Sequence, residues 1–286
     1  MLYGMTNPHG GDIYGGDVRL DFSANTNPFG TPPGVLEAVS RALPDMHRYP
    51  DPYCRRLVEK IAAFEGVNRD YILCGNGAAE LIYAYCGAVR PKTALEPAPT
   101  FSEYALGLSQ VGCRVKPYYL TPDRDFALDS HFPDYLTEIL PEAVFLCNPN
   151  NPTGMLTPPA VLKDILDVCR ENRIRLFVDE CFLDLSDDGQ SMKGYLAEYP
   201  NLFILKAFTK SYGMAGIRLG YCLCSDRELL KAMSRRVQPW NVSGLAQAAG
   251  LAALDEGDFL AKTKALIQTE RPWLKEKLEA FGFRVF

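Results

Sequence analysis

Short apolar runs alternate along this chain with longer segments in which apolar residues recur every three or four positions. A continuous apolar run is typical of a strand that is covered on both faces, whereas the longer spacing indicates a helix with one buried face. The clearest unit lies between residues 143 and 179, where two apolar runs, Ala143–Cys147 and Arg175–Asp179, flank a helical pattern. Such a strand–helix–strand unit favours a parallel sheet.

The helix inside this unit is expected to start with Thr157 as its cap and Pro158 in its first turn. Pro272 is expected to kink or break a later helix over residues 259–281. The same patterns predict further helices over 32–43, 53–64, 78–88 and 101–111, and strands over 71–74, 93–96, 113–120, 202–205 and 217–224.

Composition narrows the classes of protein. The chain has 286 residues, 47% of them hydrophobic, which suffices for a sizeable core, and its formal charge of −5 argues against nucleic-acid binding. No apolar run approaches the roughly 20 residues that span a bilayer, and the polar, Gly-rich start does not resemble a signal peptide. Nine scattered cysteines without metal-ligand spacing indicate reduced thiols, no metal site and a cytoplasmic location.

The unusual residues follow the apolar runs, where ligands of open α/β sheets bind. Residues 75–80, with the sequence Gly-Asn-Gly-Ala-Ala-Glu, lead from a strand into a helix, so free N–H groups there suit an anion. Residues 148–154, with the sequence Asn-Pro-Asn-Asn-Pro-Thr-Gly, form a rigid loop with side-chain donors. Taken alone, each segment could be an ordinary structural turn.

Three charged residues complete the pattern. Asp179 ends a buried strand, and a carboxylate there needs a cationic partner. Lys210 follows another strand among small hydroxylated residues and could form a Schiff base, and Arg218 could pair with a phosphate. Singly they could be a cap, a structural ion pair or a solvated lysine. Together they supply what pyridoxal 5′-phosphate (PLP) requires.

With this set the sequence resembles the class I/II aminotransferases, which are PLP enzymes of fold type I. The resemblance covers about residue 9 to about residue 250 and rests on Asn151-Pro152-Thr153-Gly154, Asp179, Lys210 and Arg218. It implies a three-layer α/β/α fold with a mostly parallel sheet, plus an incomplete small α/β domain. The implied parts are an N-terminal arm (1–30), a large PLP-binding domain (31–240), and a linker helix with the start of the small domain (241–286).

The resemblance also implies roles for individual residues. Lys210 holds the cofactor and moves protons at the substrate α-carbon, Asp179 keeps the ring nitrogen protonated, and Asn151 donates to the 3′-oxygen and contacts the substrate. Tyr104 stacks on the ring, and Tyr49 reaches the phosphate of a partner subunit in a homodimer with shared active sites. The phosphate site is formed by Gly77, Ala78, Ala79, Thr209 and Arg218.

Two branches of the family are nearest, threonine-phosphate decarboxylase of cobalamin synthesis and histidinol-phosphate aminotransferase. The start, with His9-Gly10-Gly11 and residues 21–28, resembles the decarboxylase more. In that branch His9 would bind a substrate phosphate and Asn27 would contact the substrate, although His9 could equally be an arm residue without this role. The expected substrate is an amino acid or its phosphate ester.

The chain departs from the family pattern in three places. Phe182 replaces a common tyrosine that donates to the 3′-oxygen, and Ala207 replaces a common hydroxyl near the phosphate. No residue up to Phe286 matches the arginine that grips the substrate carboxylate. Decarboxylation and transamination therefore both stay open, as does a degenerate homologue that only binds PLP or another phosphate ligand.

Overall fold

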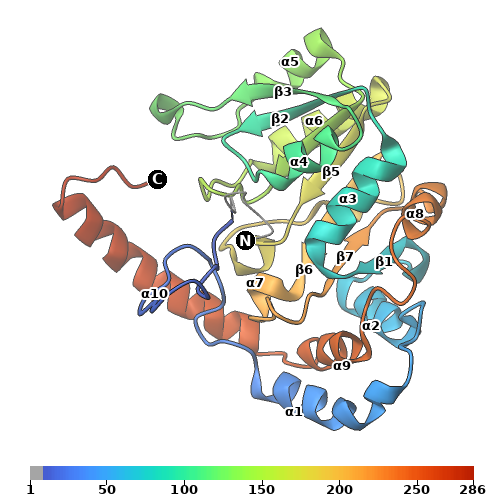
Figure 1. Ribbon diagram of the computed structural model, residues 1–286. Helices are drawn as coiled ribbons and strands as arrows, with labels where there is room; N and C mark the ends of the chain where they lie inside the picture. The colour runs from blue at the N-terminus through green and yellow to red at the C-terminus, as the bar shows by residue number, and fades with distance from the viewer. Residues whose placement is uncertain (1–8) are drawn as a thin grey trace.

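In the computed structural model, which describes residues 9–286, one seven-stranded sheet lies between two layers of helices (Figure 1). The strand order is β1-β7-β6-β5-β4-β2-β3. β7 runs antiparallel to both of its neighbours, and the other pairs are parallel. The expected three-layer fold with a mostly parallel sheet is thus confirmed.

The described elements follow the predicted alternation. The strands are β1 (Ile72–Gly75), β2 (Thr93–Ala98), β3 (Arg114–Tyr119), β4 (Ala143–Cys147), β5 (Arg175–Asp179), β6 (Leu202–Ala207) and β7 (Gly220–Leu223). The α-helices are α1 (Pro33–Ala42), α2 (Arg55–Glu65), α3 (Gly77–Val89), α4 (Glu103–Ser109), α5 (Phe132–Ile139), α6 (Pro159–Glu171), α7 (Phe208–Ser211), α8 (Arg227–Ser234), α9 (Gly244–Ala253) and α10 (Phe259–Ala280). The short 3₁₀ helices are η1 (Leu43–His47), η2 (Arg69–Tyr71), η3 (Pro122–Arg124), η4 (Leu183–Leu185) and η5 (Met192–Tyr195).

Alternation along the central strands gives the sheet two different faces. Phe145, Phe177 and Phe203 are register partners on β4, β5 and β6, and their rings stack with centroids 4.7 and 4.9 Å apart. They pack in one core with buried residues of α3, α4 and α8. We call this side of the sheet the aromatic face.

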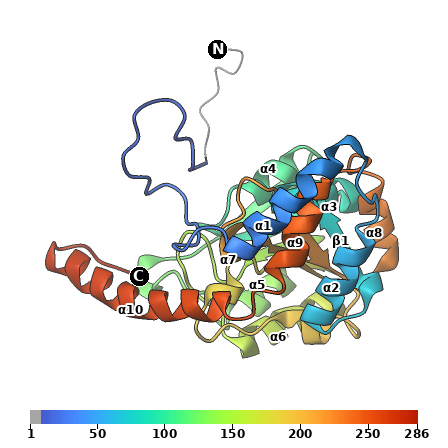
Figure 2. The same ribbon diagram turned by 90° about the horizontal axis from the view of Figure 1, so that it is seen from below.

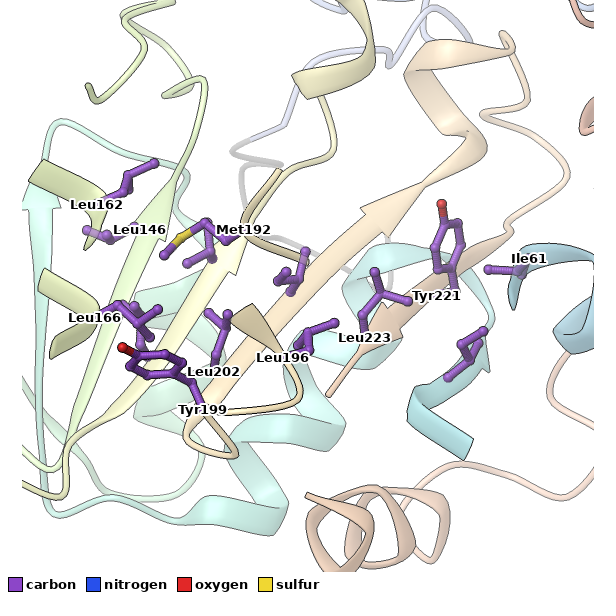
Figure 3. Close-up of a cluster of buried hydrophobic side chains, with 14 of the residues drawn as sticks. Ile61, Leu146, Leu162, Leu166, Met192, Leu196, Tyr199, Leu202, Tyr221 and Leu223 are labelled. Carbon is purple, nitrogen blue, oxygen red and sulfur yellow. The ribbon is translucent and has the colours of Figure 1, made fainter. Parts of the chain in front are cut away.

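The opposite face is aliphatic. Leu146 of β4 and Leu202 of β6 lie near Leu162 and Leu166 of α6, and Leu223 of β7 lies farther along the same face beside Tyr221, as Figure 3 shows. Buried residues of α1, α2, α5 and α9 belong to the same core, and we call this side the aliphatic face. Even-numbered residues of β6 point to it and odd-numbered ones point to the aromatic face, which determines below where each charged side chain lies.

The two ends of the chain lie outside these layers. Residues 9–32 contain no helix or strand and loop away from the body, and residues 1–8 of the expected arm lie outside the described part (Figure 2). The assignment of residues 1–30 as a separate arm stays a prediction. α10 projects from the same side of the body as the arm and is largely exposed (Figure 2). No helix within residues 9–286 has both the length and the apolar character needed to cross a bilayer.

The expected break at Pro272 and the expected cap of α6 differ from the structure. α10 runs unbroken through Pro272, because the carbonyl of Gln268 that loses its donor belongs to an exposed residue, where water can replace it. α6 begins one residue later than expected, with Pro158 as its N-cap. Thr157 does not cap it, and its backbone N–H instead donates to Oδ1 of Asn148 at 2.8 Å.

Candidate active site

The carboxyl ends of three central strands meet at one level of the sheet. Cys147, Asp179 and Leu205 are register partners on β4, β5 and β6. The asparagine loop follows the first strand, and α7 with Lys210 follows the third. The fold therefore brings together the segments that the sequence singled out, at the edge where ligands of parallel sheets bind.

Asp179 is a buried carboxylate on the aromatic face. It accepts hydrogen bonds from the backbone N–H of Cys181 at 2.9 Å and from the hydroxyl of Tyr104 at 2.8 Å. Burial raises its pKa, and these hydrogen bonds only partly oppose that effect. Among residues 9–286 no Lys or Arg side chain forms an ion pair with it. A protonated ring nitrogen of a ligand fits this place, because it would supply the missing positive charge.

Lys210 lies in α7 with its amine half-buried, 5.6 Å from the centre of the Phe182 ring. Burial lowers the pKa of this amine, and the positive charge of Arg218 lowers it further. A larger fraction of the amine is therefore neutral than for a lysine in water, which favours attack on an aldehyde. Cys181, which donates to Asp179, also lies close enough to influence Lys210, so the two groups adjoin the same residue.

The start of α3 forms an anion cradle with Arg218. No side chain caps this helix, so its first N–H groups stay available. Gly77 has φ +80°, and a Cβ there would lie 2.7 Å from Nη2 of Arg218. A Cβ on Gly220 of β7 would lie 2.8 Å from the backbone N of Ala78. The two glycines thus allow a guanidinium and backbone donors of Gly77, Ala78 and Ala79 to gather within reach of one phosphate.

In the asparagine loop, two asparagines bond within the protein and one faces a pocket. Asn148 accepts from Thr157, and Asn150 donates to Pro99 and Thr153. Asn151 makes no side-chain hydrogen bond within the described part of the chain, and it lines a pocket of about 450 Å³. Other lining residues come from the arm, from the segment after β5 and from α10, and they include Asn25, Thr26, Phe182 and Arg271. Asn151 is therefore the loop asparagine that is placed to meet a ligand.

Tyr104 corrects an expectation. It was expected to stack on the cofactor ring, but its own ring is fully buried among Phe101, Phe145 and Phe177. Its hydroxyl donates to Asp179, so it supports the carboxylate instead. Phe101 is only partly buried and is therefore the aromatic residue of this segment that remains accessible to a ligand.

Asn27 corrects a second expectation, a contact with substrate. Its buried side chain donates to the carbonyl of Ser211 at 2.8 Å and to Oγ1 of Thr263 at 3.0 Å. Both of its N–H donors are thereby used, and the residue ties the arm to α7 and α10. Its neighbours in the arm, Asn25 and Thr26, line the pocket in its place.

The remaining predicted residues lie at the edges of this region. Thr209 precedes Lys210 in α7 and is partly buried. Nε2 of His9 lies 2.7 Å from Oε1 of the buried Glu103, with Phe101 beside it. Tyr49 is exposed and stacks on Trp240 with ring centroids 4.4 Å apart.

Sequence reasoning missed some residues of the site. Phe101 stood in the same Pro-Thr-Phe-Ser-Glu-Tyr segment as Tyr104, so the segment was right and the residue wrong. Cys181 could have been noticed because it follows Asp179 by two positions, as in a turn that returns an N–H to its own carboxylate.

Comparisons with known proteins agree with this geometry. The model of the family "Aminotransferase class I and II" matches residues 18–286. Threonine-phosphate decarboxylase of Salmonella typhimurium is 35% identical over 261 residues, covering 91% of this chain and 70% of that protein. Histidinol-phosphate aminotransferase of Desulfitobacterium hafniense is 36% identical over 278 residues, covering 93% and 73%. The crystal structure of histidinol-phosphate aminotransferase from Clostridium acetobutylicum superposes with a TM-score of 0.83 at 28% identity, covering 91% and 77%.

Proposed function

This chain belongs to the aminotransferase class I and II family of PLP-dependent enzymes, and on that premise we propose that it decarboxylates an amino-acid phosphate ester of the threonine-phosphate type. The observation that carries the site assignment is that two groups lie at the carboxyl ends of neighbouring strands: a half-buried Lys210, whose pKa is lowered, and a buried Asp179 that has no cationic partner within residues 9–286. One aromatic ring with an aldehyde and a basic nitrogen satisfies both groups.

Each residue then has a defined task. Arg218 and the N–H groups at the start of α3 hold the phosphate, with the Thr209 hydroxyl beside Lys210. The Asp179 carboxylate keeps a proton on the ring nitrogen, and Tyr104 and Cys181 fix its orientation. Bound PLP supplies an electron sink for the bond that breaks at the substrate α-carbon.

The proton steps fall to Lys210. In decarboxylation the bond from the α-carbon to the carboxyl carbon breaks, carbon dioxide leaves, and the protonated Lys210 amine would deliver the proton that the α-carbon then needs. In transamination the neutral amine would instead take the α-proton, which its lowered pKa favours. Phe182 has no hydroxyl to offer the 3′-oxygen, so Asn151 makes that hydrogen bond alone. The pocket lined by Asn151 and Phe182 is the space for the substrate.

Transamination of the histidinol-phosphate type is the second candidate. It is supported by the relative at 36% identity and by the structural similarity to the Clostridium protein. The His9-Gly10-Gly11 arm supports the decarboxylase instead, since His9 lies beside Phe101 at the site, where it can reach a substrate phosphate. Both reactions use the same residues at the cofactor.

We also propose a cytoplasmic homodimer. The exposed pair Tyr49–Trp240 presents a rigid aromatic surface, and Tyr49 would reach the phosphate in the partner subunit. Sedimentation of the PLP-loaded protein should then give the mass of two chains. A monomer at micromolar concentration would exclude this assembly.

One assay separates the two reactions. PLP-loaded protein is given threonine phosphate labelled at the carboxyl carbon, and labelled carbon dioxide is collected with and without an added 2-oxo acid. Release that needs no oxo acid supports the decarboxylase, whereas oxo-acid-dependent amino transfer from histidinol phosphate supports the transaminase. A chain that holds PLP but performs neither reaction would contradict both proposals.

A further inference from the structure

A cluster of buried charges lies beneath α7, on the aliphatic face, and takes no part in the chemistry above. Its centre is Lys206 of β6, which is 4% exposed. Nζ of Lys206 lies 3.1 Å from Oε1 of Glu65 on α2 and 2.9 Å from Oδ1 of Asp184 in η4. Burying an ammonium and the carboxylates that hold it costs desolvation free energy, so the cluster is a candidate for a role beyond stability.

The cluster is completed by groups from every neighbouring element. Glu65 also accepts from the Lys193 amine at 2.8 Å and from the hydroxyl of Tyr221. Glu180 at the end of β5 accepts from the N–H of Met192 at 2.9 Å. Figure 3 shows Tyr221 of β7 beside Ile61 of α2, the helix that ends at Glu65. Lys206 thus pairs with Glu65 and Asp184, which ties α2 and η4 to β6, and it also feels the charge of Glu180.

The electrostatics agree that these groups are charged partners. Burial would raise the pKa of Glu65, but the charge of Lys206 and the hydrogen bonds from Lys193 and Tyr221 lower it below its ordinary value. Burial would lower the pKa of Lys206, but Asp184, Glu65 and Glu180 raise it. The ion pairs therefore persist throughout the physiological pH range.

The cluster connects directly to the cofactor lysine. β6 ends at Ala207, and α7 with Lys210 begins at the next residue. Oδ2 of Asp184 lies 3.4 Å from Oγ of Ser211, the residue after Lys210. Asp184 therefore binds the chain on both sides of Lys210, through Lys206 before it and Ser211 after it.

Asp184 is also linked along the chain to Phe182, on the opposite wall of the site. η4 follows Phe182 directly, and the Lys210 amine lies over the Phe182 ring. Anchoring η4 to Lys206 thus fixes the ring and the amine relative to one another. α7 has only 4 residues, so its own backbone hydrogen bonds hold Lys210 weakly.

We propose that Lys206 is a positioning residue for Lys210, which it holds in place through its buried ion pairs with Glu65 and Asp184. It touches neither cofactor nor substrate. Removing it should loosen the orientation of the Lys210 amine while the aromatic face, which carries Asp179, stays intact. The inference rests on Lys210 as the cofactor lysine and not on which of the two reactions the enzyme performs.

The test compares Lys206→Met with Lys206→Arg in the PLP-loaded protein. Visible circular dichroism reports the asymmetry of the bound cofactor, and borohydride reduction followed by peptide mass spectrometry locates its attachment. We expect Lys206→Met to retain the far-ultraviolet spectrum and bound PLP but to lose visible dichroism. We expect kcat to fall about 10- to 100-fold, the effect of misplacing a reacting group by about 1 Å. KM should change by less than about threefold, and Lys206→Arg should restore both signals.

Lys163→Met is the matched control, because Lys163 pairs with Asp167 on the surface of α6, away from the site. If Lys206→Met matches this control in visible dichroism and kcat, or if Lys206→Arg rescues neither, the positioning role is overturned. Should Lys206→Met fail to fold, Asp184→Asn carries the same test while the pair of Lys206 with Glu65 remains, and unchanged dichroism there overturns the role. Borohydride labelling away from Lys210 in the unchanged protein would instead overturn the proposed function itself.

Discussion

Two neighbouring carboxylates at the end of β5 point to opposite faces of the sheet and meet different surroundings. Among the described residues, Asp179, on the aromatic face, receives hydrogen bonds only from neutral donors, Tyr104 and Cys181. Glu180, on the aliphatic face, forms no ion pair of its own within residues 9–286, but it lies near enough to Lys206 for that ammonium to oppose the effect of burial on its pKa. Since a buried carboxylate without a cation is costly, the unmatched carboxylate of Asp179 marks the ligand site, and the ion pairs of Lys206 with Glu65 and Asp184 mark its support.

The largest expected effect is the loss of the Lys210 amine, on the ligand side of this comparison. Lys210→Ala removes the only amine placed to form the covalent link, so the near-ultraviolet to visible absorption of bound PLP should be lost and α-carbon chemistry should stop. Lys163→Ala should keep the absorption. An unchanged spectrum in Lys210→Ala would falsify the assignment of this lysine.

Asp179→Asn should lower activity strongly without lowering stability. An amide cannot hold the proton on the ring nitrogen, so kcat should fall about a thousandfold, within the usual range for a positioned proton-transfer group. Stability without cofactor should be unchanged or improved, because an uncompensated buried charge is removed. Kinetics and urea unfolding measure the two, with exposed Asp164→Asn as control, and a large loss of stability would argue that Asp179 is a structural residue.

Glu65→Gln tests the aliphatic face, where we expect a loss of stability. It leaves Lys206 with only part of its countercharge, so the free energy of unfolding should drop by about 3 kcal/mol. Glu59→Gln on the same helix breaks only an exposed pair with Arg69 and should cost less than about 1 kcal/mol. Equal losses in the two variants, measured by urea unfolding, would mean that the cluster adds nothing to stability.

The smallest expected effect is a pH dependence at Glu180. Burial raises the pKa of this carboxyl to about 7, although Lys206 and the hydrogen bond from Met192 oppose the rise. Its folded-state pKa is therefore above the unfolded value, so its contribution to stability is full at low pH and is lost as pH rises through about 7.

Glu180→Gln should flatten this fall between about pH 4.5 and 7, by on the order of 1 to 3 kcal/mol. Unfolding midpoints across that range measure it, and exposed Glu198→Gln should follow the unchanged protein. If the stability of the unchanged protein instead rose with pH over this range, relative to Glu180→Gln, the pKa of Glu180 would be lowered by folding and not raised.

Local patterns account for what could be predicted. The apolar runs of β4 and β5 and the helical spacing of α6 are short-range signals, and strand ends in a parallel sheet converge on one edge. The sequence could therefore predict that Asp179, Lys210 and Arg218 lie in one site. The boundary between large and small domain stays a prediction.

The features that could not be predicted depend on long-range packing. Phe101 and Tyr104 are equally plausible in the sequence, and only burial against Phe145 and Phe177 removes the second from reach of a ligand. Asn27 reads as a polar arm residue, yet it is buried because α7 and α10 close over it.

The sequence by itself determined the order of strands and helices and the chemical types that gather at the strand ends, since both depend on neighbours along the chain. The tertiary structure alone decided which carboxylate receives a cation from the protein and which is left for a ligand. That choice depends on Glu65 meeting Lys206 from a distant helix, and the free energy of a buried charge is set by what surrounds it in space.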